Sequence, residues 1–193
     1  MISGKNGVTS GTPKNIMFGA GTIHKNLTYS TDAWNFEESL IGATNGGSKV
    51  TITPEITPLE IDGMNVSTKN TNIKTGEVAE MEINLTELTS DIVKSAIFGT
   101  VEISEVSGYD KIVSKTDIEE GDYWDNIAFV GKKLDGSDVI VILNNALCTS
   151  GLESEGSSKS QSVGKYTFSC NAELTGDLNK LPYEIYMAVG EEG

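Results

Sequence analysis

The chain has 193 residues, of which 37% are hydrophobic and 22% charged, a balance typical of a folded globular protein rather than a disordered one. It contains no arginine and carries a formal net charge of −14, which excludes a protein that grips nucleic acid through clustered basic side chains. No stretch approaches eighteen consecutive apolar residues, and the first fifteen residues have no apolar run of the kind that a signal peptide needs. We therefore expect no membrane insertion and a protein made and folded in a cytoplasm.

The acidic residues are unevenly distributed along the chain. Residues 1–76 carry six acidic residues and six lysines, whereas residues 77–125 carry thirteen acidic residues and three lysines. The remaining residues carry nine and five. An excess of acid keeps many proteins soluble and prevents non-specific association, so it indicates no particular partner by itself.

The N-terminal half predicts a flexible arm, two strands and a long loop. We expect the polar residues 1–15 to form the arm. Apolar and polar residues alternate along residues 50–56 and again along 81–85, which is the pattern of strands with one wet face. Between them, residues 62–76 are rich in Asn, Thr and Gly and are expected to form a mobile polar loop.

One helix is expected, at about residues 90–98. Either Thr89 or Ser90 can cap its first turn, where Asp91 would also favour the positive end of the helix dipole. Gly99 is expected to end the helix. The apolar residues within it form a stripe of about two turns, enough to cover one edge or face of a sheet.

The C-terminal half predicts more strands. Asp135 and Gly136 separate an apolar segment that ends near Val130 from another at 139–143, which indicates a hairpin. A further strand is expected at 165–174. Residues 149–164 are nearly a Gly/Ser linker and are expected to form a second mobile loop. A domain boundary there is the competing interpretation, but roughly 30 residues beyond it are too few for a core, so we expect one domain, 1–193.

Residues suited to catalysis form no complete motif. Gly19 and Gly21 begin a G-x-G pattern, but position 24 is His24, so these residues are better interpreted as turn glycines. No nucleophile motif accompanies His24, which is expected to be structural or exposed. No phosphate-binding glycine loop is present. We expect no enzyme, no catalytic residues and no cofactor.

Acidic residues and cysteines could also bind metal, but neither has the spacing that metal sites require. The acidic run at 117–125 differs from a calcium-binding loop and predicts a solvated turn, with incidental ion binding as the alternative. Cys148 and Cys170 lack CxxC spacing and are expected to be buried reduced thiols, the alternative being a disulfide or metal pair. A carboxylate pair for glycoside cleavage stays open because such pairs meet in space, although aromatic residues make up only 7%.

Five segments, in the same order and spacing, resemble the major tail (tail tube) proteins of long-tailed bacteriophages. The likeness covers roughly residues 16–100, and more weakly 165–190, whereas 105–125 and 149–164 match no part of that pattern. The segments are GAG at 19–21, GATNGGS at 42–48, TITPEI at 51–56 followed by EIDG at 60–63, LTELT with the capped helix at 85–99, and PYEI at 182–185.

This resemblance implies a β-sandwich or barrel-like subunit with one flanking helix. Such subunits form rings of six, and stacked rings make the hollow tail tube of the virion, through which DNA leaves without being specifically bound. The implied partners are other copies of the chain and the tail tip or baseplate, tape measure and terminator proteins. Assembly would take place in the bacterial host cytoplasm.

The resemblance and the charge pattern together suggest two sets of site residues. Strand alternation places Glu55, Glu80 and Glu82 opposite Ile56, Met81 and Ile83, so we expect the three glutamates to line the lumen. A tube lined with carboxylates would repel DNA phosphates. The resemblance also implies a ring-stacking loop at 62–76. The residues assigned to this loop are Asp62, Gly63, Asn65, Lys69, Asn70 and Lys74.

Two other kinds of protein remain possible from the sequence. One is the inner-tube protein of a phage-tail-like contractile injection device, which would use the same subunit fold. The other is a β-sandwich surface adhesin, which would share the strand pattern and the Gly/Ser loops but would need a secretion signal.

Overall fold

The computed structural model describes residues 7–9, 11–153 and 161–188. The protein is mainly β, as predicted, and is built on one antiparallel sheet of seven strands in the order β1-β8-β9-β10-β5-β4, with β11 pairing with β9. Its strands are β1 (Met17–Lys25), β4 (Thr44–Pro58), β5 (Asn72–Leu85), β8 (Trp124–Lys133), β9 (Asp138–Cys148), β10 (Gly164–Cys170) and β11 (Tyr183–Met187).

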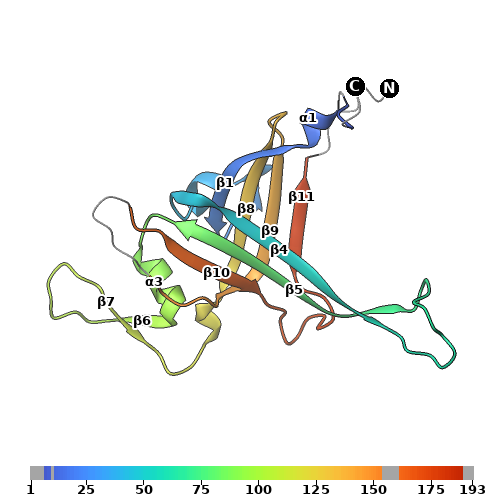
Figure 1. Cartoon of the computed structure of the whole chain (residues 1–193). Helices are drawn as coiled ribbons and strands as arrows, with labels where there is room; N and C mark the ends of the chain where they lie inside the picture. Colours follow the sequence, from blue (N-terminus) through green and yellow to red (C-terminus); the bar gives the residue numbers. More distant parts are fainter. Residues whose placement is uncertain (1–6, 10, 154–160, 189–193) are drawn as a thin grey trace.

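The sheet folds over into two layers. Strands β4, β5 and β10 cross in front of β1, β8, β9 and β11 (Figure 1). The inner surfaces of both layers form the main core, which includes Ile23, Met81, Leu143 and Phe168, all fully buried. At one edge the layers also meet through the N–H of Ile41, which donates to the carbonyl of Ile23 at 3.0 Å. The fold class is therefore sandwich-like with a flanking helix, in agreement with the prediction.

The flanking helix is α3 (Ser90–Ile97), which covers one end of the core. The Thr89 side chain accepts the N–H of Ile92 at 3.4 Å, so Thr89 is the cap rather than Ser90. Ile92 and Ala96 join the core cluster. The helix ends one residue earlier than expected, because Phe98 adopts the left-handed conformation with φ 48°.

Short elements cover part of the outer surface of the β1-β8-β9 layer. They are α2 (Phe36–Ser39) and the two-stranded ribbon of β2 (Tyr29–Ser30) and β3 (Ala33–Trp34). Trp34 and Phe36 pack on a second apolar cluster, and its members are Leu27, Ala128, Val130, Ile140 and Ile142. These strands are thus apolar on both faces, which explains why the segment at 139–143 is apolar without interruption.

Four further elements lie around this sheet. Helix α1 (Thr12–Asn15) precedes β1, β6 (Gly99–Glu102) pairs with β7 (Lys111–Ser114) in a separate hairpin, and η1 (Glu120–Asp122) leads into β8. The flexible N-terminal segment predicted at 1–15 therefore includes a helical turn, and its residues 1–6 and 10 lie outside the described residues. The loop predicted at 149–164 is shorter, because β10 already begins at Gly164, and its residues 154–160 also lie outside the described part.

Several predicted strand limits were wrong. The hairpin around Gly136 is real, with φ +85° at that glycine, but its strands are longer than expected and run to Lys133 and from Asp138. Strand β10 ends at Cys170 rather than at 174. Gly19 and Gly21 are not turn glycines: they lie within β1, where the pairing with β8 shifts register between Phe18 and Thr22. A bulge of this kind needs the positive φ that both glycines adopt.

Three parts project from the two-layer core (Figure 1). The first, which we name the arm, comprises residues 54–77, the outer ends of β4 and β5 with the connection 59–71. The second, the tongue, comprises the strand ends around residues 17, 131, 139 and 187 of β1, β8, β9 and β11. The third is the β6–β7 hairpin, which lies at the end of the molecule opposite the tongue.

Candidate assembly surfaces

The three predicted lumen glutamates share one face of the sheet. Lys49 pairs with Glu82, Thr51 with Glu80 and Glu55 with Gly76 across β4 and β5, so all three side chains point away from the core. Alternation correctly placed Met81 and Ile83 on the opposite side, where both are fully buried. The prediction for Ile56 was wrong: its side chain is 61% exposed, because at this point β4 has left the core and entered the arm.

This outer face is hydroxyl-rich and carries less net charge than expected. The Lys49 ammonium lies 3.0 Å from the Glu82 carboxylate. The Ser169 hydroxyl donates to Glu80 at 3.4 Å. The register of β10 against β5 adds Lys165 to the same face, so three glutamates are accompanied by two lysines. The face therefore repels anions weakly, and it offers no guanidinium that could bind a phosphate bidentately.

The predicted stacking loop at 62–76 is in fact shorter. Strand β5 begins at Asn72, so only residues 59–71 connect the two strands of the arm. Lys74 therefore lies within a strand, where its ammonium is 2.8 Å from the Glu77 carboxylate. The other five residues assigned to the loop, Asp62, Gly63, Asn65, Lys69 and Asn70, do lie in this connection.

The connection and the neighbouring strand ends are more apolar on their surface than the sequence suggested. Large side chains here are exposed, and they belong to Ile56, Leu59, Ile61, Val66 and Ile73. At the base of the arm the Tyr183 hydroxyl donates to Glu77 at 3.1 Å, and hydrogen bonds from Lys74 and Tyr183 lower the pKa of Glu77. The base is thus held to the core, whereas the apolar groups of the tip have no cover within the described subunit.

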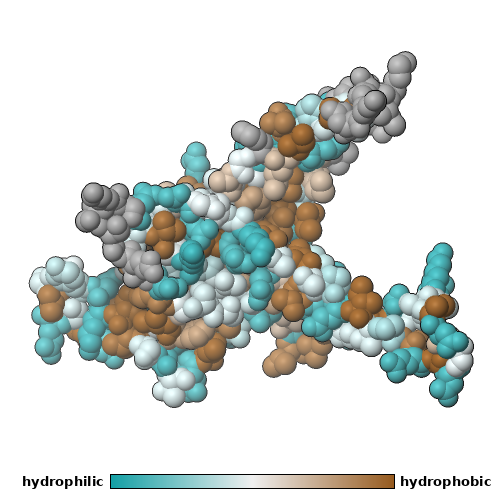
Figure 2. Space-filling view, in the orientation of Figure 1, coloured by the Kyte–Doolittle hydropathy of each residue, from teal (hydrophilic) through white to brown (hydrophobic). Residues whose placement is uncertain are grey.

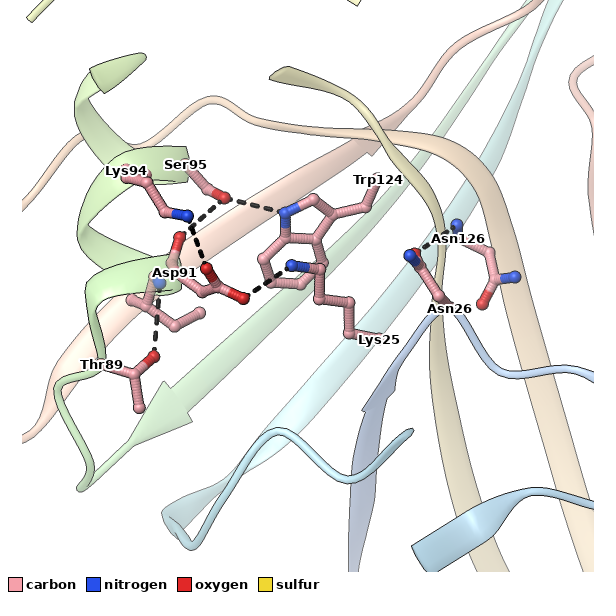
Figure 3. A network of polar contacts seen from close by, with 9 residues as sticks. Lys25, Asn26, Thr89, Asp91, Lys94, Ser95, Trp124 and Asn126 are labelled. Carbon is pink, nitrogen blue, oxygen red and sulfur yellow. Dashed lines mark hydrogen bonds and ion pairs between the residues drawn. The ribbon is translucent and has the colours of Figure 1, made fainter. Parts of the chain in front are cut away.

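A polar network fixes α3 to the sheet (Figure 3). Asp91 is 2.7 Å from the Lys94 ammonium and 3.0 Å from that of Lys25, and these two bonds lower the pKa of Asp91. The Trp124 indole N–H donates to the Ser95 hydroxyl at 2.8 Å, and Lys25 also lies 4.7 Å from the centroid of the Trp124 ring. Each group has a partner within the subunit, so the network positions the helix against the sheet.

His24 is buried and structural, which is one of the two outcomes expected. Its ring nitrogens lie 2.8 Å from the Thr22 hydroxyl and 2.9 Å from the Ser39 hydroxyl. The ring also packs on Phe36, with 5.5 Å between centroids. Burial lowers the pKa of His24. The histidine thus ties α2 to β1 in its neutral form.

The acidic run at 117–125 is not simply a solvated turn. The Asp122 side chain is only 7% exposed and lies 2.8 Å from the Lys115 ammonium, which also pairs with Glu119 at 2.7 Å. The Glu119 N–H donates to the Asp122 carboxylate at 2.7 Å. Burial alone would raise the pKa of Asp122, but the Glu119 N–H and the Lys115 ammonium outweigh it and lower that pKa. The sequence did not reveal this pair, because Lys115 and Asp122 are seven positions apart in irregular structure.

Both cysteines are free and buried, as predicted. Burial raises the pKa of the Cys148 thiol, and it raises the pKa of Cys170 to about 11. Such thiols are inert packing groups. Within residues 7–9, 11–153 and 161–188, no three His, Cys, Asp or Glu side chains come together in a way that could hold a metal ion. Across the same part of the chain, no helix is both long enough and apolar enough to cross a membrane.

No family model matches this chain, and no curated protein matches it either. Its function must therefore be argued from the residues and surfaces described above.

Proposed function

We propose that this chain is the structural subunit of a hollow protein tube, of the kind formed by the major tail proteins of long-tailed bacteriophages. The observation that carries the proposal is the arm. Its two strands stay paired from the core out to Pro58 and Asn72, where no second layer covers them. A rigid projection with exposed apolar side chains gains stability when a neighbouring molecule buries them.

The five-segment resemblance supports the same proposal, because its third segment runs into the outgoing half of the arm. TITPEI lies in β4, and EIDG follows in the connection at its tip. The tip contacts would join one ring of subunits to the next, with Asp62, Gly63, Asn65, Lys69 and Asn70 at or near the contact. Lys74 serves instead to position the arm through Glu77.

The outer face of β4, β5 and β10 would form the wall of the lumen. Glu55, Glu80 and Glu82 lie on it together with threonine and serine hydroxyls. If six subunits form a ring, each ring presents these groups sixfold around the path of the DNA. Such a wall would conduct DNA without holding it, and the subunit would belong to the virion tail after assembly in the host cytoplasm.

Electron microscopy and sedimentation of the purified protein test the proposal directly. We expect wild-type protein to form rings or tubes as its concentration rises. Ile61→Asp combined with Val66→Asp should prevent ring stacking, because it places two charges in an apolar contact. The matched control, Leu174→Asp combined with Leu178→Asp, adds the same charges to two exposed apolar positions outside the arm and should still stack.

A second variant removes the tip while keeping the hairpin closed. The N–H of Leu59 donates to the carbonyl of Thr71 at 2.7 Å, so replacing residues 60–70 by Asn-Gly leaves a two-residue turn on this bond. This variant should stay folded and form rings without tubes. A wild-type protein that remains a 20.6 kDa monomer at high concentration would refute the proposed function.

The lumen assignment has its own test. Changing Glu55, Glu80 and Glu82 to lysine should leave assembly intact while giving the wall a positive charge that holds phosphate. DNA release from particles carrying this variant should slow at low salt and recover as salt rises. Release at the wild-type rate at all salt concentrations would mean that these residues do not line the DNA path.

A further inference from the structure

The tongue presents an apolar sheet face that nothing in the described subunit covers. Register places Phe129, Val141 and Ile185 side by side on the core face, and then Gly131, Val139 and Met187 one step further out. The first row joins the core through Phe129 and Val141. Further out the face opens, because β4 and β5 diverge from the tongue, and Met187 is 59% exposed.

Other apolar side chains enlarge this open face. A Cβ added to Gly131 would meet the Met17 sulfur at 3.0 Å, so Met17 lies across the same face beside the Phe129 ring. The Met17, Ile185 and Met187 side chains are all about half exposed. Figure 2 shows the hydrophobic surface running along this part of the molecule. Exposed apolar surface that continues directly from a core is typical of an interface.

The β6–β7 hairpin carries the second apolar surface outside the arm. Ile103 is 94% exposed, and Val101, Val106 and Tyr109 are also exposed. Ile103, Val106 and Tyr109 line one shallow depression. The hairpin contacts the rest of the subunit mainly through α3, so its outer side is available to another molecule.

Charge distinguishes the two surfaces in a complementary way. Residues 99–123, which contain the hairpin, hold seven acidic residues and two lysines, and both lysines are already in ion pairs. The described part of the tongue tip is better balanced: the Lys132 ammonium lies 3.6 Å from the Asp138 carboxylate. Hydrogen bonds from Ser137, and then the nearby Lys133 ammonium, lower the pKa of Asp135. In a protein with a net charge of −14, copies repel one another least where an acidic surface meets a balanced one.

We propose that the tongue of one copy receives the β6–β7 hairpin of the next copy. Because the two surfaces lie at opposite ends of the molecule, the contact is head-to-tail and can be repeated from copy to copy. Ile103, Val106 and Tyr109 of one copy pack against Met17, Ile185 and Met187 of the other. This inference rests on the proposed tube function and adds to it a contact that does not use the arm.

Two complementary variants test the contact. The tongue variant carries Ile185→Asp and Met187→Asp, and the hairpin variant carries Ile103→Asp and Val106→Asp. Each should raise the protein concentration needed for assembly by at least about tenfold, which corresponds to ~1.4 kcal/mol. The matched control, Leu174→Asp with Leu178→Asp, charges two exposed leucines outside both surfaces and should assemble like the wild type.

Mixing the tongue variant with the hairpin variant tests the contact more specifically than either variant does alone. The tongue variant keeps an intact hairpin and the hairpin variant keeps an intact tongue, so an equimolar mixture should form heterodimers in sedimentation velocity that neither forms alone. Circular dichroism checks that each variant is folded. If folded variants assemble like the wild type, or if the mixture gives no heterodimer, the contact is overturned while wild-type tubes still support the proposed function. A monomeric wild type would overturn both proposals.

Discussion

Gly21, at the bulge of β1, leaves no room for a side chain, and a single substitution can measure the free-energy cost of adding one. Gly21 adopts φ +70°, and a Cβ at this position would lie 2.4 Å from the Phe129 ring and 2.8 Å from the carbonyl oxygen of Val130. Gly21→Ala therefore combines two costs. A left-handed alanine costs about 1–2 kcal/mol, and forcing a methyl group against a packed ring costs about 1–3 kcal/mol more. We expect a loss of about 2–5 kcal/mol in the free energy of unfolding.

Two other glycines separate these costs. Gly136 has φ +85° with nothing within 4 Å, so Gly136→Ala should show the backbone cost alone, about 1–2 kcal/mol. Gly131 has no positive φ, but its Cβ would lie 2.9 Å from Phe129, so Gly131→Ala should show the packing cost alone, about 1–3 kcal/mol. Urea denaturation followed by tryptophan fluorescence measures all three variants.

A double-mutant cycle tests whether the packing cost comes from the Phe129 ring. In a Phe129→Leu background the ring edge that meets the new methyl group is gone, so Gly21→Ala should cost less than it does in the wild type. The reasoning is wrong if Gly21→Ala destabilises no more than Gly136→Ala, or if the cost is unchanged in the Phe129→Leu background.

Three further predictions concern the helix and the buried titratable groups. Thr89→Ala removes the cap of α3 and should cost about 1 kcal/mol of stability, whereas Thr89→Ser should cost less; thermal unfolding measures both. Because burial lowers the pKa of His24, the stability of the folded state should be full above pH 6.5 and fall as pH drops below it; His24→Gln should remove this part of the pH dependence in urea titrations. Asp122 has a lowered pKa, so its contribution should be lost as pH falls below 3.8, and Asp122→Asn should flatten the acid limb of the stability profile.

Local patterns predicted the parts of this fold that local forces determine. Alternation identified the buried side of β5 at Met81 and Ile83, and the two candidate caps, Thr89 and Ser90, identified the start of α3 to within one residue. Alternation failed at Ile56, because the pattern says which side a residue faces but not whether another layer covers that side. The G-x-G pattern did not reveal the bulge at Gly21, because a bulge and a turn both need positive φ and only the partner strand distinguishes them.

For the candidate surfaces too, the sequence predicted what local alternation determines and missed what depends on strand register. The three glutamates were correctly placed on one face, because pleating alone determines this. The accompanying Lys49 and Lys165 could not be assigned there from sequence, since their position depends on the register of β4 and β10 against β5. The tongue was missed for a related reason: an uninterrupted apolar strand indicates burial on both faces, and only the structure shows that one of them is left open.

The distribution of apolar and charged groups accounts for how an acidic chain could assemble in an ordered way. A net charge of −14 disfavours random contact between copies, so only surfaces that bury enough apolar area, or that meet a region of balanced charge, can overcome the repulsion. The arm tip would satisfy the first condition, and the proposed pairing of tongue with β6–β7 hairpin would satisfy both. The outer face of β4, β5 and β10, where hydroxyls and mixed charges dominate, satisfies neither and would remain in water. Repulsion between copies would thus leave the surface that we propose for the lumen wall free, while permitting the proposed contacts at the projecting ends.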